Sequence, residues 1–99
     1  MIRGTTPTLT FVLPFDTSVI KSAFVTVESN GIGIEKALAD CTLEGNVLYT
    51  TLTQEETLQL PKNWRAEVQL RVLLNDGKAL ATEIYEVKVA DILKEGVIV

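Results

Sequence analysis

The sequence predicts an all-β fold, a sandwich of about seven antiparallel strands with one short helical turn. Three observations lead to this prediction. Most apolar residues recur at every second position, as in strands that bury one face. Glycine, proline and asparagine turn signals separate these segments about every 8–12 residues. The chain has 99 residues, the size of one domain with a single core, so we predict one domain over residues 1–99.

The first two predicted strands differ in the number of faces that they bury. Thr8–Leu13 alternates cleanly between apolar and polar positions. Its inward side chains are Leu9, Phe11 and Leu13. Val19–Glu28 has apolar residues on both faces, with Phe24 on one and Val25 on the other. Such a strand lies in the centre of a sandwich or has its second face covered by a partner.

Two hairpins are predicted next. Asn30-Gly31 is a tight-turn signal, because both central positions of a type I′ turn need a positive φ. Its returning strand is Ile32–Leu38. Cys41–Leu43 and Val47–Leu52 form the second hairpin, for which we predict a three-residue loop, Glu44-Gly45-Asn46.

A single helical turn is predicted before the last hairpin. In Thr53-Gln54-Glu55-Glu56 the threonine hydroxyl can accept from the backbone of Glu56 while the Glu56 carboxylate reaches back, which is a capping box. Pro61 ends this turn after a few residues, so no long helix is expected.

The last hairpin carries the strongest alternation in the chain. Within Trp64–Leu74 the apolar residues from Ala66 to Leu74 alternate with Glu67, Gln69 and Arg71, and Asn75-Asp76-Gly77 supplies a turn with glycine where φ must be positive. Lys78–Val89 returns, with a change of phase that predicts a bulge or a two-sided strand near Thr82–Ile84. The inward residues expected at its end are Tyr85, Val87 and Val89. This outline is typical of an immunoglobulin-like β-sandwich, although the Cys…Trp…Cys signature of antibody-type domains is missing.

Composition argues against several classes of function. The chain has no histidine, one cysteine and a formal net charge of −4. We therefore expect no nucleic-acid partner, no metal or other cofactor, and no enzymatic activity. Carboxylate pairs such as Glu55-Glu56 are interpreted as turn and helix-start residues. Cys41 is expected to be a small buried residue, since no neighbour would stabilise its thiolate. No apolar run could span a membrane and no targeting segment opens the chain, so no membrane partner is expected either.

Six residues are candidates for an interface. The apolar side chains of Phe24 and of the end Val97-Ile98-Val99 are more than one small core needs. Trp64 and Arg65 have the composition of an interface hot spot, but Trp64 at the start of a long strand can also cap the core, which we favour. The terminal segments could add to the sheet of a neighbouring chain. The alternative, that each terminus completes a sheet of its own chain, is slightly preferred.

Several stretches resemble a group of small prophage-encoded proteins of Gram-positive gut bacteria. They are Met1–Thr8 (MIRGTTPT), Leu13–Thr17 (LPFDT), Asp40–Asn46 (DCTLEGN), Thr51–Thr57 (TLTQEET) and Val68–Val72 (VQLRV) through Asp76-Gly77. The late order of helical turn, long strand, Asn-Asp-Gly and long strand is loosely similar to the immunoglobulin-like N-terminal domains of phage baseplate proteins. The resemblance implies a phage-structural context and no catalytic residues.

These observations lead to a functional expectation. We expect a non-enzymatic structural or adaptor protein of a phage particle (tail, baseplate, neck or capsid-associated) that works through protein–protein contacts. Its partners would be other phage structural proteins and copies of itself, and its location the bacterial host cytoplasm during assembly and then the virion. The alternative is a small ligand- or carbohydrate-binding module, which requires exposed aromatic platforms.

Overall fold

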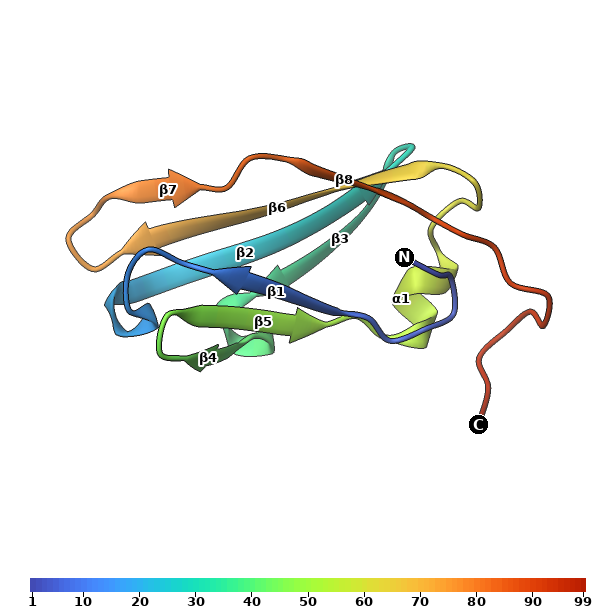
Figure 1. The fold of residues 1–99 in the computed structure, drawn as a ribbon, viewed down its shortest axis with the longest axis horizontal. Helices are drawn as coiled ribbons and strands as arrows, with labels where there is room; N and C mark the ends of the chain where they lie inside the picture. The colour runs from blue at the N-terminus through green and yellow to red at the C-terminus, as the bar shows by residue number, and fades with distance from the viewer.

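The computed structural model describes all 99 residues and contains two antiparallel β-sheets (Figure 1). The first sheet has three strands in the order β1-β5-β4, and the second has β3-β2-β6 with β7 and β8 both paired to β6. The strands are β1 Thr8–Val12, β2 Ile20–Ser29, β3 Ile32–Ala37, β4 Thr42–Glu44, β5 Val47–Thr51, β6 Arg65–Leu74, β7 Ala79–Ala81 and β8 Tyr85–Lys88. One α-helix, α1 Gln54–Leu58, and two short 3₁₀ helices, Thr17–Val19 and Leu38–Asp40, complete the chain.

The core lies between the two sheets. Phe11 and Leu48 from the first sheet belong to the same buried cluster as Val25, Val68 and Leu70 from the second. In β6 every second residue from Ala66 to Val72 is buried, as the alternation predicted. The sandwich-like arrangement of two packed antiparallel sheets is therefore confirmed.

The strand order differs from that of a constant-type immunoglobulin domain. In that fold the first, second, fourth and fifth strands share one sheet. Here β2 lies between β3 and β6 in the opposite sheet, and β1 pairs only with β5. The chain therefore has two packed sheets, as that fold does, but β2 pairs with different strands. The strand count is eight rather than seven because β7 and β8 are separate strands.

Two irregularities explain the residues that broke the alternation. The register between β2 and β6 shifts between Ile20 and Ser22, which turns Ile20 into the core although Phe24 faces outward. Farther along, Ala81 lies opposite Arg71, and Tyr85 lies opposite Val68. The chain from β7 to β8 therefore advances four residues where β6 advances three. This extra residue is the bulge predicted at Thr82–Ile84.

The turns follow glycine and asparagine as expected, with one correction. Asn30 and Gly31 have φ of 48° and 83°, and Gly77 has φ of 90°. In the β4–β5 hairpin, however, Glu44 pairs with Val47, so the loop has two residues rather than the predicted three. Gly45, with φ of 57°, provides the reversal, because its missing Cβ makes this conformation inexpensive.

The helix begins with the predicted capping box. The backbone N–H of Glu56 donates to the Thr53 hydroxyl at 3.1 Å, and the Thr53 N–H donates to the Glu56 carboxylate at 2.8 Å. Lys36 of β3 donates to the same carboxylate at 2.7 Å. Partial burial alone would raise the pKa of Glu56, but Lys36 and the Thr53 hydrogen bonds outweigh it, so the pKa lies below its usual value. Glu56 thereby fixes the helix to the five-stranded sheet.

Arg3 ties the two ends of the chain to the helix. Its guanidinium donates to the carbonyls of Leu58 and Leu60 at 3.1 and 3.0 Å, and to the carboxylates of Asp91 and Glu95 at 2.9 and 3.3 Å. Near it, Ile2 forms a single parallel bridge with Ala90.

The segment after Asp91 forms no strand, so the preferred expectation that it would complete a sheet is wrong. Instead, the Gln54 side-chain amide both donates to the Ile98 carbonyl and accepts from the Ile98 N–H, at 3.2 and 2.9 Å. None of the helices is long and apolar enough to cross a membrane.

Candidate interaction surfaces

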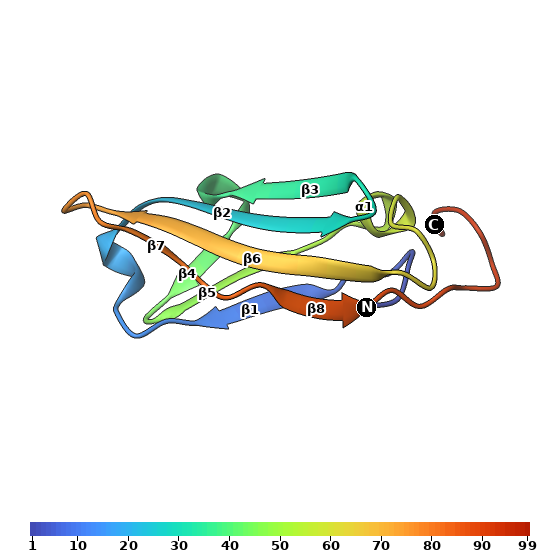
Figure 2. The ribbon, with the colours of Figure 1, turned by 90° about the horizontal axis from the view of Figure 1, so that it is seen from above.

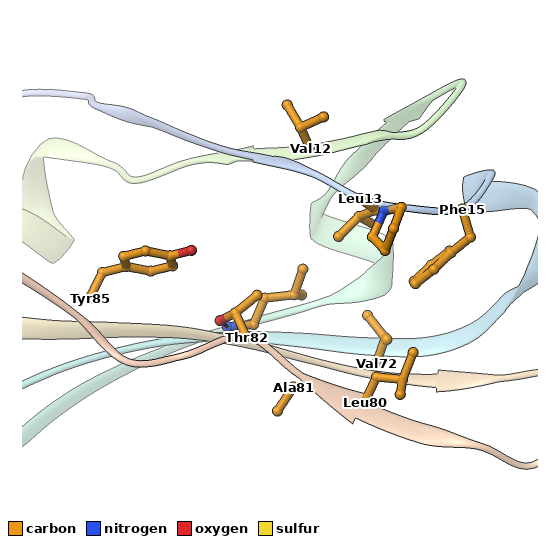
Figure 3. Close-up of a pocket in the computed structure, with 10 residues that line it drawn as sticks. Val12, Leu13, Phe15, Val72, Leu80, Ala81, Thr82 and Tyr85 are labelled. Atoms are coloured by element: carbon orange, nitrogen blue, oxygen red, sulfur yellow. Dashed lines mark hydrogen bonds between the residues drawn. The ribbon is translucent and has the colours of Figure 1, made fainter.

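An apolar groove opens where the edges of the two sheets approach each other. It has a volume of about 310 Å³ and is lined by residues of three segments. These are Val12–Phe15 at the end of β1, Leu70 and Val72 of β6, and Leu80–Thr82 with Tyr85 of β7 and β8. Figure 3 shows the ring of Tyr85 at one end of the groove and the ring of Phe15 at the other, with Val72 and Leu80 across from Phe15.

The topology explains why the groove is open. β1 pairs only with β5, and β7 and β8 pair only with β6, so both flanking strands present a free edge. These edges run along the same side of the molecule (Figure 2). No further strand closes the sandwich on this side, and the apolar side chains between the layers therefore remain accessible there.

The bulge shapes one wall of the groove. Thr82 donates its backbone N–H to the Leu70 carbonyl at 2.9 Å, and its hydroxyl accepts from the Leu70 N–H at 3.1 Å. The Thr82 carbonyl accepts from the Gln69 side chain at 3.0 Å. The Thr82 hydroxyl thus takes the place of the backbone carbonyl that the bulge displaces, so the Leu70 N–H of β6 keeps a hydrogen-bond acceptor on this wall.

The lining has no charged side chain. Its polar atoms include the Thr82 hydroxyl, which already accepts from Leu70, and the Tyr85 phenol. Leu80 is 43% exposed and Tyr85 55% exposed. Tyr85 stands opposite the buried Val68, so its side chain is on the inward face as predicted, but it stays exposed because β8 is an edge strand beside the open groove. The groove is therefore suited to apolar side chains.

The predicted interface residues lie on separate parts of the surface. Phe24, Arg65 and Val97 each line a different shallow hollow, so the structure does not bring them together. Trp64 is 55% exposed and does not cap the core, contrary to the interpretation that we favoured. Val97, Ile98 and Val99 are all exposed near the helix.

Phe24 lies on the outer face of the five-stranded sheet. It is 43% exposed and stands opposite Arg71 across the β2–β6 pair. Farther along the same strands, Glu28 stands opposite Glu67, and Glu67 opposite Glu86. One face therefore carries an aromatic ring with a cation at one end and three carboxylates in a row at the other.

Cys41 and Asp40 both make hydrogen bonds to the backbone of Ala37. The Cys41 thiol donates to the Ala37 carbonyl at 3.3 Å, and burial raises its pKa although a hydrogen bond with Thr50 opposes the shift. The Asp40 carboxylate accepts from the Ala37 N–H at 3.0 Å. No group of three or more Cys, Asp or Glu side chains is placed to hold a metal ion.

Comparison of the chain with protein-family models, with curated proteins and with solved structures gives no match. The interpretation of these surfaces therefore depends on their own chemistry. Sequence reasoning missed the groove, because its walls come from segments about residues 12 and 80 that only the sheet edges bring together. The phase change at Thr82–Ile84 was the one local signal of it.

Proposed function

We propose that this protein is a non-enzymatic structural or adaptor subunit of a phage particle that acts through protein–protein contacts. The observation that carries the proposal is the groove between β1 and β7–β8, which is apolar, accessible and bordered by two free strand edges. The phage context itself comes from the resemblance of residues 1–8, 13–17, 40–46, 51–57 and 68–77 to small prophage proteins. In this proposal the protein is made in the bacterial host cytoplasm and ends in the virion.

The occupant that fits the groove is an extended apolar segment of another virion protein. Unpaired N–H and C=O groups of an edge strand bind such a segment, and alternate side chains enter the adjacent hollow. A volume of about 310 Å³ accepts a few aliphatic or aromatic side chains. Because the lining has no charge to desolvate, apolar burial supplies most of the binding free energy.

A carbohydrate-binding role is the second candidate. The observation in its favour is the pair of aromatic rings, Tyr85 and Phe15, at the two ends of the groove (Figure 3). Sugar sites also need several convergent polar groups, whereas the side chains of this lining offer only the hydroxyls of Thr82 and Tyr85. The groove chemistry therefore favours a protein segment, and binding to a glycan array would reverse this order.

The experiment is site-specific photo-crosslinking in purified particles. A benzoylphenylalanine at Leu80, within the groove, should form an adduct with another virion protein, identified by mass spectrometry. The matched control is the same residue at Leu43, an exposed position on β4 at the far edge of the three-stranded sheet. Absence of the protein from particles would refute the virion role. Equal adducts from both positions would refute the groove as the contact.

A further inference from the structure

The free edge of β1 is the one strand edge of the fold without protection against pairing. Sheet edges are usually guarded by charged side chains, prolines, bulges or a very short strand. The β3 edge carries Glu35 and Lys36, β4 has three residues and ends in Glu44, and the bulge interrupts the β7–β8 edge. β1 has none of these features, and no charged residue occurs from residue 4 to residue 15. Its edge is therefore open to a further strand.

The hydrogen bonds at the two ends of β1 show which of its backbone groups face this edge. The Leu13 N–H donates to the Asn46 carbonyl at 2.8 Å, and the Pro7 carbonyl accepts from the Leu52 N–H at 3.0 Å. Because the direction alternates along an antiparallel strand, the odd-numbered residues direct their N–H and C=O groups toward β5. The residues between them direct these groups away from β5, where no strand lies. They are Thr8, Thr10 and Val12.

We propose that β1 pairs with β1 of a second copy in an antiparallel two-fold dimer. An axis at Thr10 sets Thr10 opposite itself and Thr8 opposite Val12 of the second copy, so these residues exchange about six backbone hydrogen bonds. A register shifted toward Val12 sets Thr10 opposite Pro14, which has no N–H to donate. A shift the other way sets Val12 opposite Gly4, outside the strand. The axis at Thr10 is therefore the register that uses every free group.

The side chains that this register brings together favour a second copy as the partner. On the inner face, Leu9 of each copy lies opposite Phe11 of the other, so an apolar pair forms twice and covers the half-buried Leu9. On the outer face, Val12, which is 73% exposed, lies beside Thr8 of the second copy. No like charges are opposed in this ladder. Both strands are already extended and held by β5, so pairing does not require a flexible segment to become ordered, as binding of an unfolded peptide would.

The charges of the other layer stay outside this contact. The layer's edge on the same side of the molecule is β7–β8 (Figure 2). Its charged residues, Glu86 and Lys88, have opposite signs and alternate with the inward Tyr85, so their side chains point to the outer face of the five-stranded sheet. Of the residues that line the groove, the dimer ladder uses only Val12. The inference therefore does not depend on the proposed phage function.

The test places charges at the two-fold axis. Thr10→Glu and Thr10→Lys each bring two like charges together, so we expect each to raise the dimer dissociation constant about tenfold. An equimolar mixture of the two variants pairs opposite charges and should have a dissociation constant close to that of the wild type. Thr10→Pro removes an N–H that has no partner in the monomer but donates at the centre of the dimer, and should raise the constant about 100-fold. Sedimentation velocity of the purified full chain over a concentration series measures these constants.

The matched controls are Thr42→Glu and Thr42→Lys. Thr42 is an exposed threonine of β4 in the same row of the sheet as Thr10, separated from it by Tyr49, so both variants should leave the dissociation constant unchanged. Circular dichroism and thermal melts verify that each variant is folded. A wild-type chain that stays monomeric at millimolar concentration overturns the proposal. So does a dimer that Thr10→Pro leaves intact, or a mixture of the two charged Thr10 variants that associates no better than either alone.

Discussion

Replacing Arg3 by alanine is expected to loosen both ends of the chain at once. The Arg3 side chain is only 14% exposed, and its guanidinium contacts two carbonyls at the end of α1 and two carboxylates of the segment after Ala90. The variant leaves these carbonyls without a donor in a partly buried place. It also releases Asp91, whose pKa is held below its usual value first by the Ile92 N–H and then by Arg3 and Lys62.

The size of the effect follows from these contacts. Each charge-assisted bond to a partly buried carbonyl contributes about 1.5 kcal/mol, the low end of the usual range because water can reach the site. The two carboxylate contacts are more exposed, and we expect no measurable addition from them. We therefore expect Arg3→Ala to lower the free energy of unfolding by about 3 kcal/mol, which corresponds to about 12 °C in the melting temperature of a domain of this length.

Urea unfolding followed by circular dichroism measures this loss. Arg3→Lys serves as a partial replacement, because an ammonium keeps the charge but cannot reach both carbonyls, and about half of the loss should remain. Lys94→Ala removes an exposed charge from the same segment and should cost less than about 0.5 kcal/mol. If Arg3→Ala were no less stable than Lys94→Ala, the guanidinium would not hold these segments together as described.

Three further predictions concern single side chains. Glu56→Gln should lose about 1 kcal/mol of stability at neutral pH and nothing in acid. The folded-state pKa of Glu56 is lowered, so its carboxylate stabilises the fold above the unfolded-state pKa, and this stabilisation is lost as the pH falls. Urea unfolding at several pH values measures the difference. Thr82→Val should lower the free energy of unfolding by about 1–2 kcal/mol, because it leaves the Leu70 N–H without an acceptor, whereas Thr82→Ser retains this hydrogen bond. Equal losses of stability for the two variants in thermal melts would contradict the role of the hydroxyl. The Cys41 thiol should react with a disulfide reagent far more slowly than a free thiol at mildly alkaline pH, and denaturant should abolish the difference.

Local patterns predicted the elements well because each depends on neighbouring residues. The alternation from Ala66 to Val72 identified the face that β6 buries, and Asn30-Gly31 located a turn whose positive φ angles the structure contains. The Thr53–Glu56 capping box located the helix start to the residue. In these cases the sequence signal and its physical cause lie within a few positions.

Long-range arrangement could not be derived in the same way. Nothing local to β2 specifies that it pairs with β6 in the second sheet rather than with a strand of the first. The register shift after Ile20 reverses which side chains face inward, so a strict two-residue period misassigns that position. Trp64 is exposed because it precedes the first residue of β6, and Tyr85 because it lies on the edge strand β8. The groove and the outer charged face both arise from such pairings, which is why sequence reasoning identified single residues of them and not the surfaces.

The bulge at Thr82–Ile84 also bears on solubility. It divides one edge of the larger sheet into β7, with three residues, and β8, with four. A long, flat edge can be extended by copy after copy and leads to fibrils, whereas an edge that changes register in its middle offers no continuous ladder to an incoming strand. A segment that pairs here is limited to a few residues in one register. This edge is therefore a poor template for open-ended growth of the larger sheet.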